Sequence, residues 1–73
     1  MIFTFTPIVG SPIANVAYDT DKSQIAVTFR DTTVLYHYPA TVDSYQRFML
    51  AERAGDYYRY NILGTIPQSN TSL

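Results

Sequence analysis

Hydrophobic and polar residues alternate most clearly in the middle of the chain. In the segment 24–30, the apolar residues Ile25, Val27 and Phe29 fall on one side of an extended backbone, and polar residues fall on the other. A period of two predicts a half-buried strand. The segment 33–38 follows after a tight turn and alternates in the same way, with Leu35 and His37 on one face. The two segments together predict an antiparallel hairpin.

Two further strands are predicted nearer the start of the chain. Residues 2–6 alternate and are followed by Pro7, which stops sheet pairing. Residues 13–18 are mostly apolar, and the polar residues 19–23 that follow have the composition of a hairpin loop. The order strand, loop, strand, turn, strand therefore indicates a small antiparallel sheet.

The spacing of apolar residues changes from two to about three and a half after Pro39. Thr41 is a suitable N-cap, Asp43 lies where the helix dipole favours an acid, and Gly55 is a natural breaker. An apolar stripe runs between them and ends at a charge: Val42, Tyr45, Phe48, Met49 and Glu52. This stripe predicts one amphipathic helix. Residues 62–63 are expected to form a last short strand or a docked segment.

These elements predict an α+β fold, in which one helix packs across a small antiparallel sheet of three or four strands. We expect residues 1–10 to form an N-terminal strand or arm, 11–66 a single domain, and 67–73 a polar, frayed tail. The predicted core combines the strand and helix stripes: Ile25, Val27, Phe29, Val42, Tyr45, Phe48 and Met49.

Composition narrows the classes of function. The chain has 73 residues, no cysteine and one histidine, so neither a disulfide nor a thiolate metal site can form. A domain this small is marginally stable alone, which favours a homo-oligomer. The net charge of −1 argues against bulk binding of nucleic acid. Residues 1–7 contain neither a signal peptide nor a membrane span, and we expect a cytoplasmic protein.

The order of these features resembles the KTSC domain family, a small module found at the C-terminus of some lysyl-tRNA synthetases and as stand-alone bacterial and phage proteins. Five elements carry the resemblance, and they run from Ser11 to Leu63: Ser11 with Ala17-Tyr18-Asp19, the strand around Val27, Tyr36-His37-Tyr38, Pro39 with Val42 and Tyr45, and Ala51 with Gly55 and Tyr57-Tyr58. The resemblance implies a fold more than a function, because the biochemistry of the family is poorly defined.

Aromatic and basic residues gather in two clusters, which are the candidate binding residues. One cluster lies at the end of a strand and the other just after Gly55, where we expect an irregular loop. Their members, with Arg53 at the helix end, are Tyr36, His37, Tyr38, Tyr57, Tyr58, Arg59, Tyr60 and Asn61. Tyrosine offers an apolar face with a polar tip, and arginine can pair with phosphate or stack on a ring. Structural explanations stay open for each residue, since strand tyrosines often pack in a core and loop arginines are often solvated.

We therefore expect a small ligand-binding protein that captures a nucleotide-like molecule in a Tyr/Arg-lined pocket at a subunit interface. The size of the chain and the occurrence of the family suggest a phage protein that sequesters a host nucleotide immune signal. One alternative is a protein-interaction module, an inhibitor or adaptor, that docks on a host protein through the same aromatic patch. A second alternative is an RNA-contacting accessory domain, as the synthetase fusion implies.

Catalysis is not expected. The one histidine has no carboxylate nearby in the sequence to orient it, and nucleophilic catalysis needs an aligned base. The three glycines are scattered at 10, 55 and 64, so no phosphate-binding glycine loop exists. Asp19 and Asp21 read as solvated turn residues. We predict no catalytic residues, no metal site and no cofactor.

Overall fold

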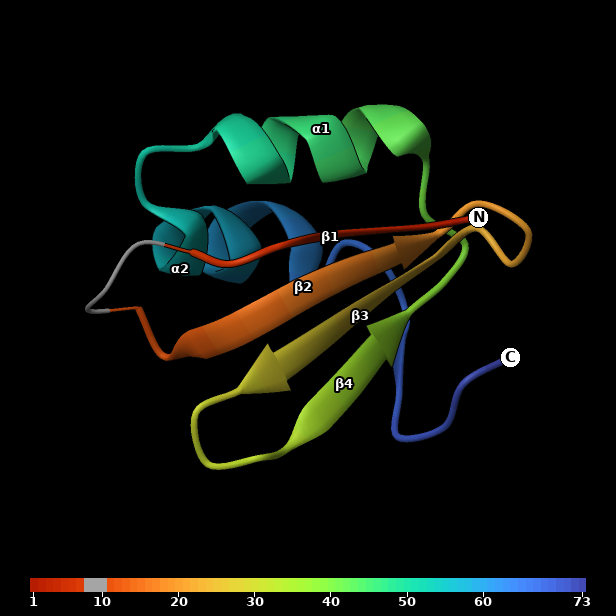
Figure 1. Cartoon of the computed structure of the whole chain (residues 1–73), viewed down its shortest axis with the longest axis horizontal. Helices are drawn as coiled ribbons and strands as arrows, with labels where there is room; N and C mark the ends of the chain where they lie inside the picture. The colour runs from red at the N-terminus through yellow and green to blue at the C-terminus, as the bar shows by residue number, and fades with distance from the viewer. Residues whose placement is uncertain (8–10) are drawn as a thin grey trace.

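A single antiparallel sheet forms the body of the protein, and its strands are arranged in chain order (Figure 1). The computed structural model describes residues 1–7 and 11–73. The strands are β1 (Ile2–Phe5), β2 (Ile13–Asp19), β3 (Gln24–Phe29), β4 (Val34–His37) and β5 (Gln68–Ser69). Each strand pairs with the next through a short connection, except β5, which returns from the end of the chain to pair with β4.

The strand register determines which side chains enter the core. Ile25 of β3 lies opposite Tyr18 of β2 and His37 of β4, and Val27 lies opposite Val16. Because side chains alternate between the faces of a sheet, all five belong to one face. These five side chains are buried, so this face carries the core.

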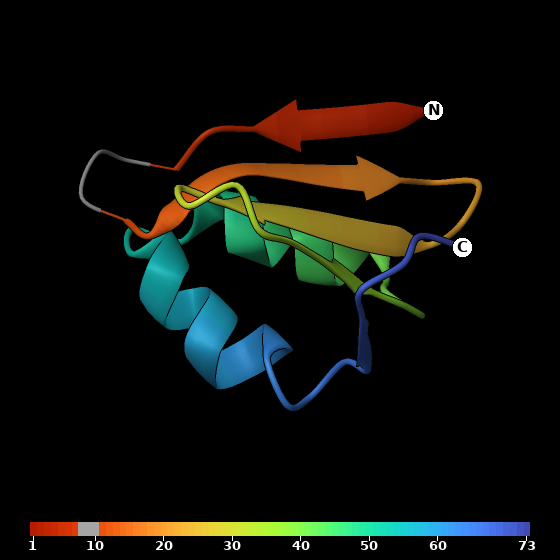
Figure 2. The ribbon, with the colours of Figure 1, turned by 90° about the horizontal axis from the view of Figure 1, so that it is seen from below.

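Helices cover only that face of the sheet (Figure 2). Helix α1 (Val42–Leu50) is followed by a short helix α2 (Ala54–Tyr57), which continues into one π-helical segment, η1 (Tyr58–Ile62). The Thr41 hydroxyl accepts a hydrogen bond from the Ser44 amide at 3.1 Å, so the predicted N-cap is confirmed. Helix α1 ends at Leu50, five residues before the predicted breaker.

Stacked and tilted aromatic rings fill the space between helices and sheet. Phe48 is fully buried, and its ring centroid lies 5.3 Å from that of Phe5, 5.7 Å from that of Tyr57 and 6.1 Å from that of Tyr58. The rings of Tyr18 and Tyr45 stack at 5.3 Å. These rings therefore form one aromatic layer that joins the helices to the sheet.

The sequence prediction needs two corrections at the level of the fold. The sheet has five strands rather than three or four, and α2 with η1 adds a second helical element to the single predicted helix. Within the predicted core, Ile25, Val27, Tyr45 and Phe48 are buried. Val42 and Met49 are 49% and 43% exposed, so their assignment to the core was wrong. The apolar stripe is wider than the surface that the sheet can cover.

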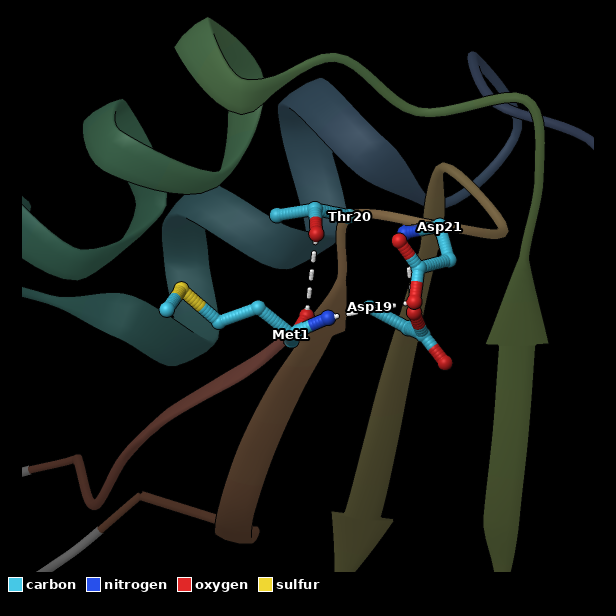
Figure 3. A network of polar contacts seen from close by, with 4 residues as sticks. All are labelled: Met1, Asp19, Thr20 and Asp21. Carbon is cyan, nitrogen blue, oxygen red and sulfur yellow. Dashed lines mark hydrogen bonds and ion pairs between the residues drawn. The ribbon is translucent and has the colours of Figure 1, made fainter.

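The two ends of the chain are both bonded to the sheet. The predicted N-terminal strand is β1, and the Met1 carbonyl accepts hydrogen bonds from the amide and the hydroxyl of Thr20 (Figure 3). Asp19 and Asp21 shape the same hairpin, since the Asp19 carboxylate accepts from the Asp21 amide at 3.0 Å. At the other end, the Gln24 side chain accepts from the Leu73 amide at 2.8 Å, where a frayed tail was expected.

Candidate functional site

His37 is the centre of the buried polar chemistry. Its side chain is fully buried on the helix-covered face of the sheet, and its Nε2 lies 2.7 Å from the Tyr58 hydroxyl. Its Nδ1 lies 3.3 Å from the Ile66 carbonyl oxygen. A carbonyl can only accept, so Nδ1 carries the proton and the Tyr58 hydroxyl donates to Nε2. The sequence predicted that His37 contacts a ligand, but the His37 side chain is fully buried and exposes no atom to one.

Burial shifts the titration of both partners away from the charged forms. Loss of solvent lowers the pKa of His37, and the hydrogen bond to the Ile66 carbonyl partly opposes that change. Burial raises the pKa of Tyr58 to about 12. Both groups therefore stay neutral near pH 7, and the pair links strand β4 to η1 as a structural hydrogen bond.

The segment 57–61 is helical, so the predicted irregular loop is wrong. Tyr58 is buried between Phe48, His37 and Phe29, and Tyr57 is half-buried against Phe48. Both tyrosines thus pack against the core, and Tyr58 leaves little of its ring for a ligand.

Three neighbouring residues of η1 remain on the outside: Arg59, Tyr60 and Asn61, which we call the η1 surface. The Arg59 guanidinium carbon lies 5.9 Å from the centre of the Tyr60 ring, within the range of a cation–π contact. The Tyr60 side chain is 73% exposed. Here an exposed cation and an exposed ring lie together, as the sequence predicted for this cluster.

Arg53 belongs to a separate position at the start of α2. Its guanidinium lies 3.8 Å from the Asp56 carboxylate, and both side chains are well exposed. A contact at this distance between solvated groups contributes little to stability. Arg53 stays available for a ligand, but no contact joins it to Arg59 in the part of the chain that the structure describes.

Tyr36 and Tyr38 lie away from the η1 surface. Tyr36 pairs with Ala26 on the face of the sheet that no helix covers, opposite to the face of His37. The Tyr38 hydroxyl donates to the Thr71 carbonyl at 3.4 Å, near the end of the chain. The structure thus divides the nine predicted site residues among the core, the open face of the sheet and the outside of α2 and η1.

Two hollows in the described surface have other linings. One, of about 370 Å³, lies at the β3–β4 turn and is lined by Pro12, Phe29, Arg30, Asp31 and Thr33. The other, of about 170 Å³, lies on the open face and is lined by Ile2, Ala17, Asp19, Lys22, Gln24, Ala26 and Ser72. Neither contains a predicted site residue. In the first hollow, Arg30 donates a hydrogen bond through Nε to the Ser11 carbonyl.

Gly55 brings the start of β2 against α2. A Cβ at this position would lie 3.2 Å from Cδ of Pro12 and 3.3 Å from Oγ of Ser11. Ser11 Oγ already accepts from the Ile13 amide, and the proline ring is rigid, so neither neighbour moves freely. Gly55 is therefore required for close approach and does not terminate the helix.

We expect Gly55→Ala to lower the free energy of unfolding by about 1 kcal/mol. Alanine would gain up to about 1 kcal/mol in helix propensity, but overpacking costs about 1–3 kcal/mol. Chemical denaturation measures the free energy of unfolding of the wild type and the variant. The same substitution is then made in a Pro12→Ala background, which lacks the proline ring that crowds the new methyl group. The interpretation fails if Gly55→Ala stabilises the wild-type protein, or if its cost is unchanged in the Pro12→Ala background.

Comparison with known proteins supports the fold. The KTSC domain model matches residues 10–65 of the chain. The structure is similar to the crystal structure of a KTSC domain protein from Yersinia pestis, with a TM-score of 0.83 and 21% identity over 99% of this chain and 100% of that chain. No curated protein matches the chain significantly. Among the described residues, no helix combines the length and the apolar character that a membrane span needs.

Proposed function

We propose that this chain, which belongs to the KTSC domain family, is a small non-enzymatic protein that binds a nucleotide-like ligand at the η1 surface. The observation that carries the proposal is the contact between Arg59 and Tyr60, both exposed and adjacent in space. A base can stack on the Tyr60 ring while the guanidinium meets a phosphate. Asn61 adds an amide that can donate and accept.

The charge of Arg59 is available for such a ligand. Arg47 and Arg53 each have a carboxylate partner, Asp43 and Asp56, whereas Arg59 forms no ion pair with any described residue. An arginine without a carboxylate partner presents its full set of donors to an incoming anion. Arg53 is also available, but Arg59 lies beside the exposed Tyr60 ring, so Arg59 is the principal phosphate contact in our proposal.

A ligand on the η1 surface needs a second wall. Small-molecule sites usually bury most of their ligand, and neither of the two hollows described above includes a residue of the η1 surface. We therefore propose that the pocket is completed by another copy of the chain. In this setting a phage protein would sequester a host nucleotide signal by enclosing it between subunits, a context that rests on the distribution of the family.

A second candidate function is docking on a host protein. The specific observation in its favour is that the η1 surface is open and is followed by Leu63, which is 40% exposed. Tyrosine and arginine are enriched among the residues that dominate protein interfaces. An inhibitor or adaptor would bind its partner through the side chains of the η1 surface, and it would not need a pocket there.

A nucleotide panel tests the first candidate. We expect one class of nucleotide to raise the melting temperature, because a ligand at 100 times its Kd stabilises the native state by about 2.7 kcal/mol. Arg59→Ala and Tyr60→Ala should abolish the shift, since both side chains are exposed and neither substitution should disturb the fold. Arg47→Ala removes another exposed arginine, on α1, and is the matched control, which should keep the shift in melting temperature.

The possible outcomes separate the candidates. No shift with any nucleotide would contradict the first proposal, and capture of one host protein that Arg59→Ala abolishes would then support the second. A gel shift with RNA that weakens steeply with salt would support the RNA-contacting alternative instead.

A further inference from the structure

We propose that β1 is a self-association edge, through which two copies of this chain join their sheets into one continuous sheet. Strand β1 pairs with β2 on one side only and forms an outer edge of the sheet. This inference rests on residues other than the η1 surface and does not depend on the proposed function. It is separate from the ligand-dependent contact proposed at the η1 surface, and it locates the self-association of the ligand-free protein, which the small size of the domain favours.

The backbone of β1 presents a short set of unpaired groups at this edge. The Met1 carbonyl accepts a hydrogen bond from the Thr20 amide, so Met1 bonds to β2. Every second residue of β1 does the same, and the next two are Phe3 and Phe5. Because hydrogen-bonding direction alternates along a strand, the amides and carbonyls of Ile2 and Thr4 point outward. An exposed edge of this kind is a template for another strand.

The outward groups are complementary to a second copy of themselves. In an antiparallel pair centred on Phe3, Ile2 of one copy lies opposite Thr4 of the other, and the same holds in reverse. Each such pair exchanges two hydrogen bonds, so every outward group of Ile2 and Thr4 in both copies is satisfied. Phe3 would lie directly opposite its own counterpart, in the closely spaced arrangement that favours an aromatic pair.

The side chains at this edge also favour a second copy. Residues 2–6 carry no charge and no proline, which are the usual protections of an edge strand. Phe3 is 47% exposed on the face that carries the helices. On the same face of the sheet, Val42 and Met49 of α1 are also exposed apolar residues. An uncharged strand of the same composition fits this apolar edge without leaving a buried charge unpaired.

A substitution that adds one cysteine tests the geometry directly. The wild-type chain has none, so Phe3→Cys introduces a single thiol. In the proposed dimer, residue 3 of one copy lies directly opposite residue 3 of the other. The Cα atoms of such a pair are close enough for a disulfide. We expect mild oxidation to convert Phe3→Cys to a covalent dimer on a non-reducing gel. Gln46→Cys, at an exposed site on α1 and away from both β1 and the η1 surface, is the matched control and should stay monomeric.

The mass in solution tests the association itself. Light scattering should give twice the 8.3 kDa chain mass for the wild-type protein at about 100 μM. Thr4→Pro removes an outward amide but none of the bonds to β2, so it should be a folded monomer by circular dichroism. Thr4→Val keeps the amide and should stay dimeric. A wild-type monomer, a Thr4→Pro dimer, or equal cross-linking of the two cysteine variants would overturn the inference.

Discussion

Phe48→Ala is expected to lower the free energy of unfolding by about 3–5 kcal/mol. Phe48 is fully buried, and its ring lies against those of Phe5, Tyr57 and Tyr58. Its removal would leave a cavity where β1, α1, α2 and η1 meet, and no neighbouring element can collapse into it without breaking another ring contact. Domains of this kind are stable by only about 5–15 kcal/mol, so the variant should be close to unfolding.

Thermal unfolding provides the measurement for Phe48→Ala. In a domain of this size, each kcal/mol lowers the melting temperature by about 4–8 °C, so the loss should exceed 10 °C. Leu50→Ala is the matched control, because Leu50 lies on the same helix and is 77% exposed. Its effect should stay within about 0.5 kcal/mol. Equal effects of the two substitutions would show that α1 does not pack as described.

Tyr58→Phe is expected to cost about 1–3 kcal/mol, the second largest effect. The substitution keeps the ring in the aromatic layer but removes the donor to His37 Nε2, which lies 2.7 Å away and is buried. Tyr45→Phe is the matched control, because the Tyr45 hydroxyl is buried without a hydrogen-bond partner among the described residues. Its removal should be neutral or stabilising. Denaturant titrations that gave both variants the same cost would contradict the His37–Tyr58 bond.

The same pair makes stability depend on pH. Burial lowers the pKa of His37 below its ordinary value of 6.5, so the unfolded chain takes up a proton before the folded protein does. The contribution of neutral His37 to the free energy of unfolding is complete above pH 6.5. It is lost as the pH falls from 6.5 to the lower pKa of the folded state. His37 is the only histidine, so His37→Gln should flatten the slope between pH 7.5 and 5. Stability that rose on acidification in this window would contradict the burial of a neutral imidazole.

Local patterns in the sequence predicted most of the fold. Alternation was sufficient for β3 and β4, because a strand with one buried face shows a period of two. Strand β2 was predicted from its apolar residues and from the polar loop that follows them. It also placed Leu35 and His37 on one face, which the register with Val27 and Ile25 confirms. The N-cap at Thr41 was equally readable, since its chemistry is local. The family resemblance agreed with these elements, and the family match confirms it.

The errors arose where tertiary contacts decide. Alternation cannot tell which face of β4 is covered, and only the packing of η1 makes His37 buried and leaves Tyr36 on the open face. Gly55 predicted the end of one helix, whereas it lies inside the second helix, α2. A glycine is needed there because Ser11 and Pro12 pack closely against it. The polar residues 68–69 carry no hydrophobic signal, yet they pair with β4 through backbone groups alone. In each case the deciding partner is distant in the sequence.

The central claim is that the tyrosine cluster is divided: Tyr57 and Tyr58 pack in the core, and we propose that Arg59 and Tyr60 bind the ligand. Backbone amide spectra of a labelled sample, recorded during titration with the nucleotide that the panel selects, test this claim most directly. We predict shift changes concentrated at Arg59, Tyr60 and Asn61, with those of His37 and Phe48 small. Changes centred instead on the hollow around Arg30 and Thr33, or no changes at saturating nucleotide, would contradict it.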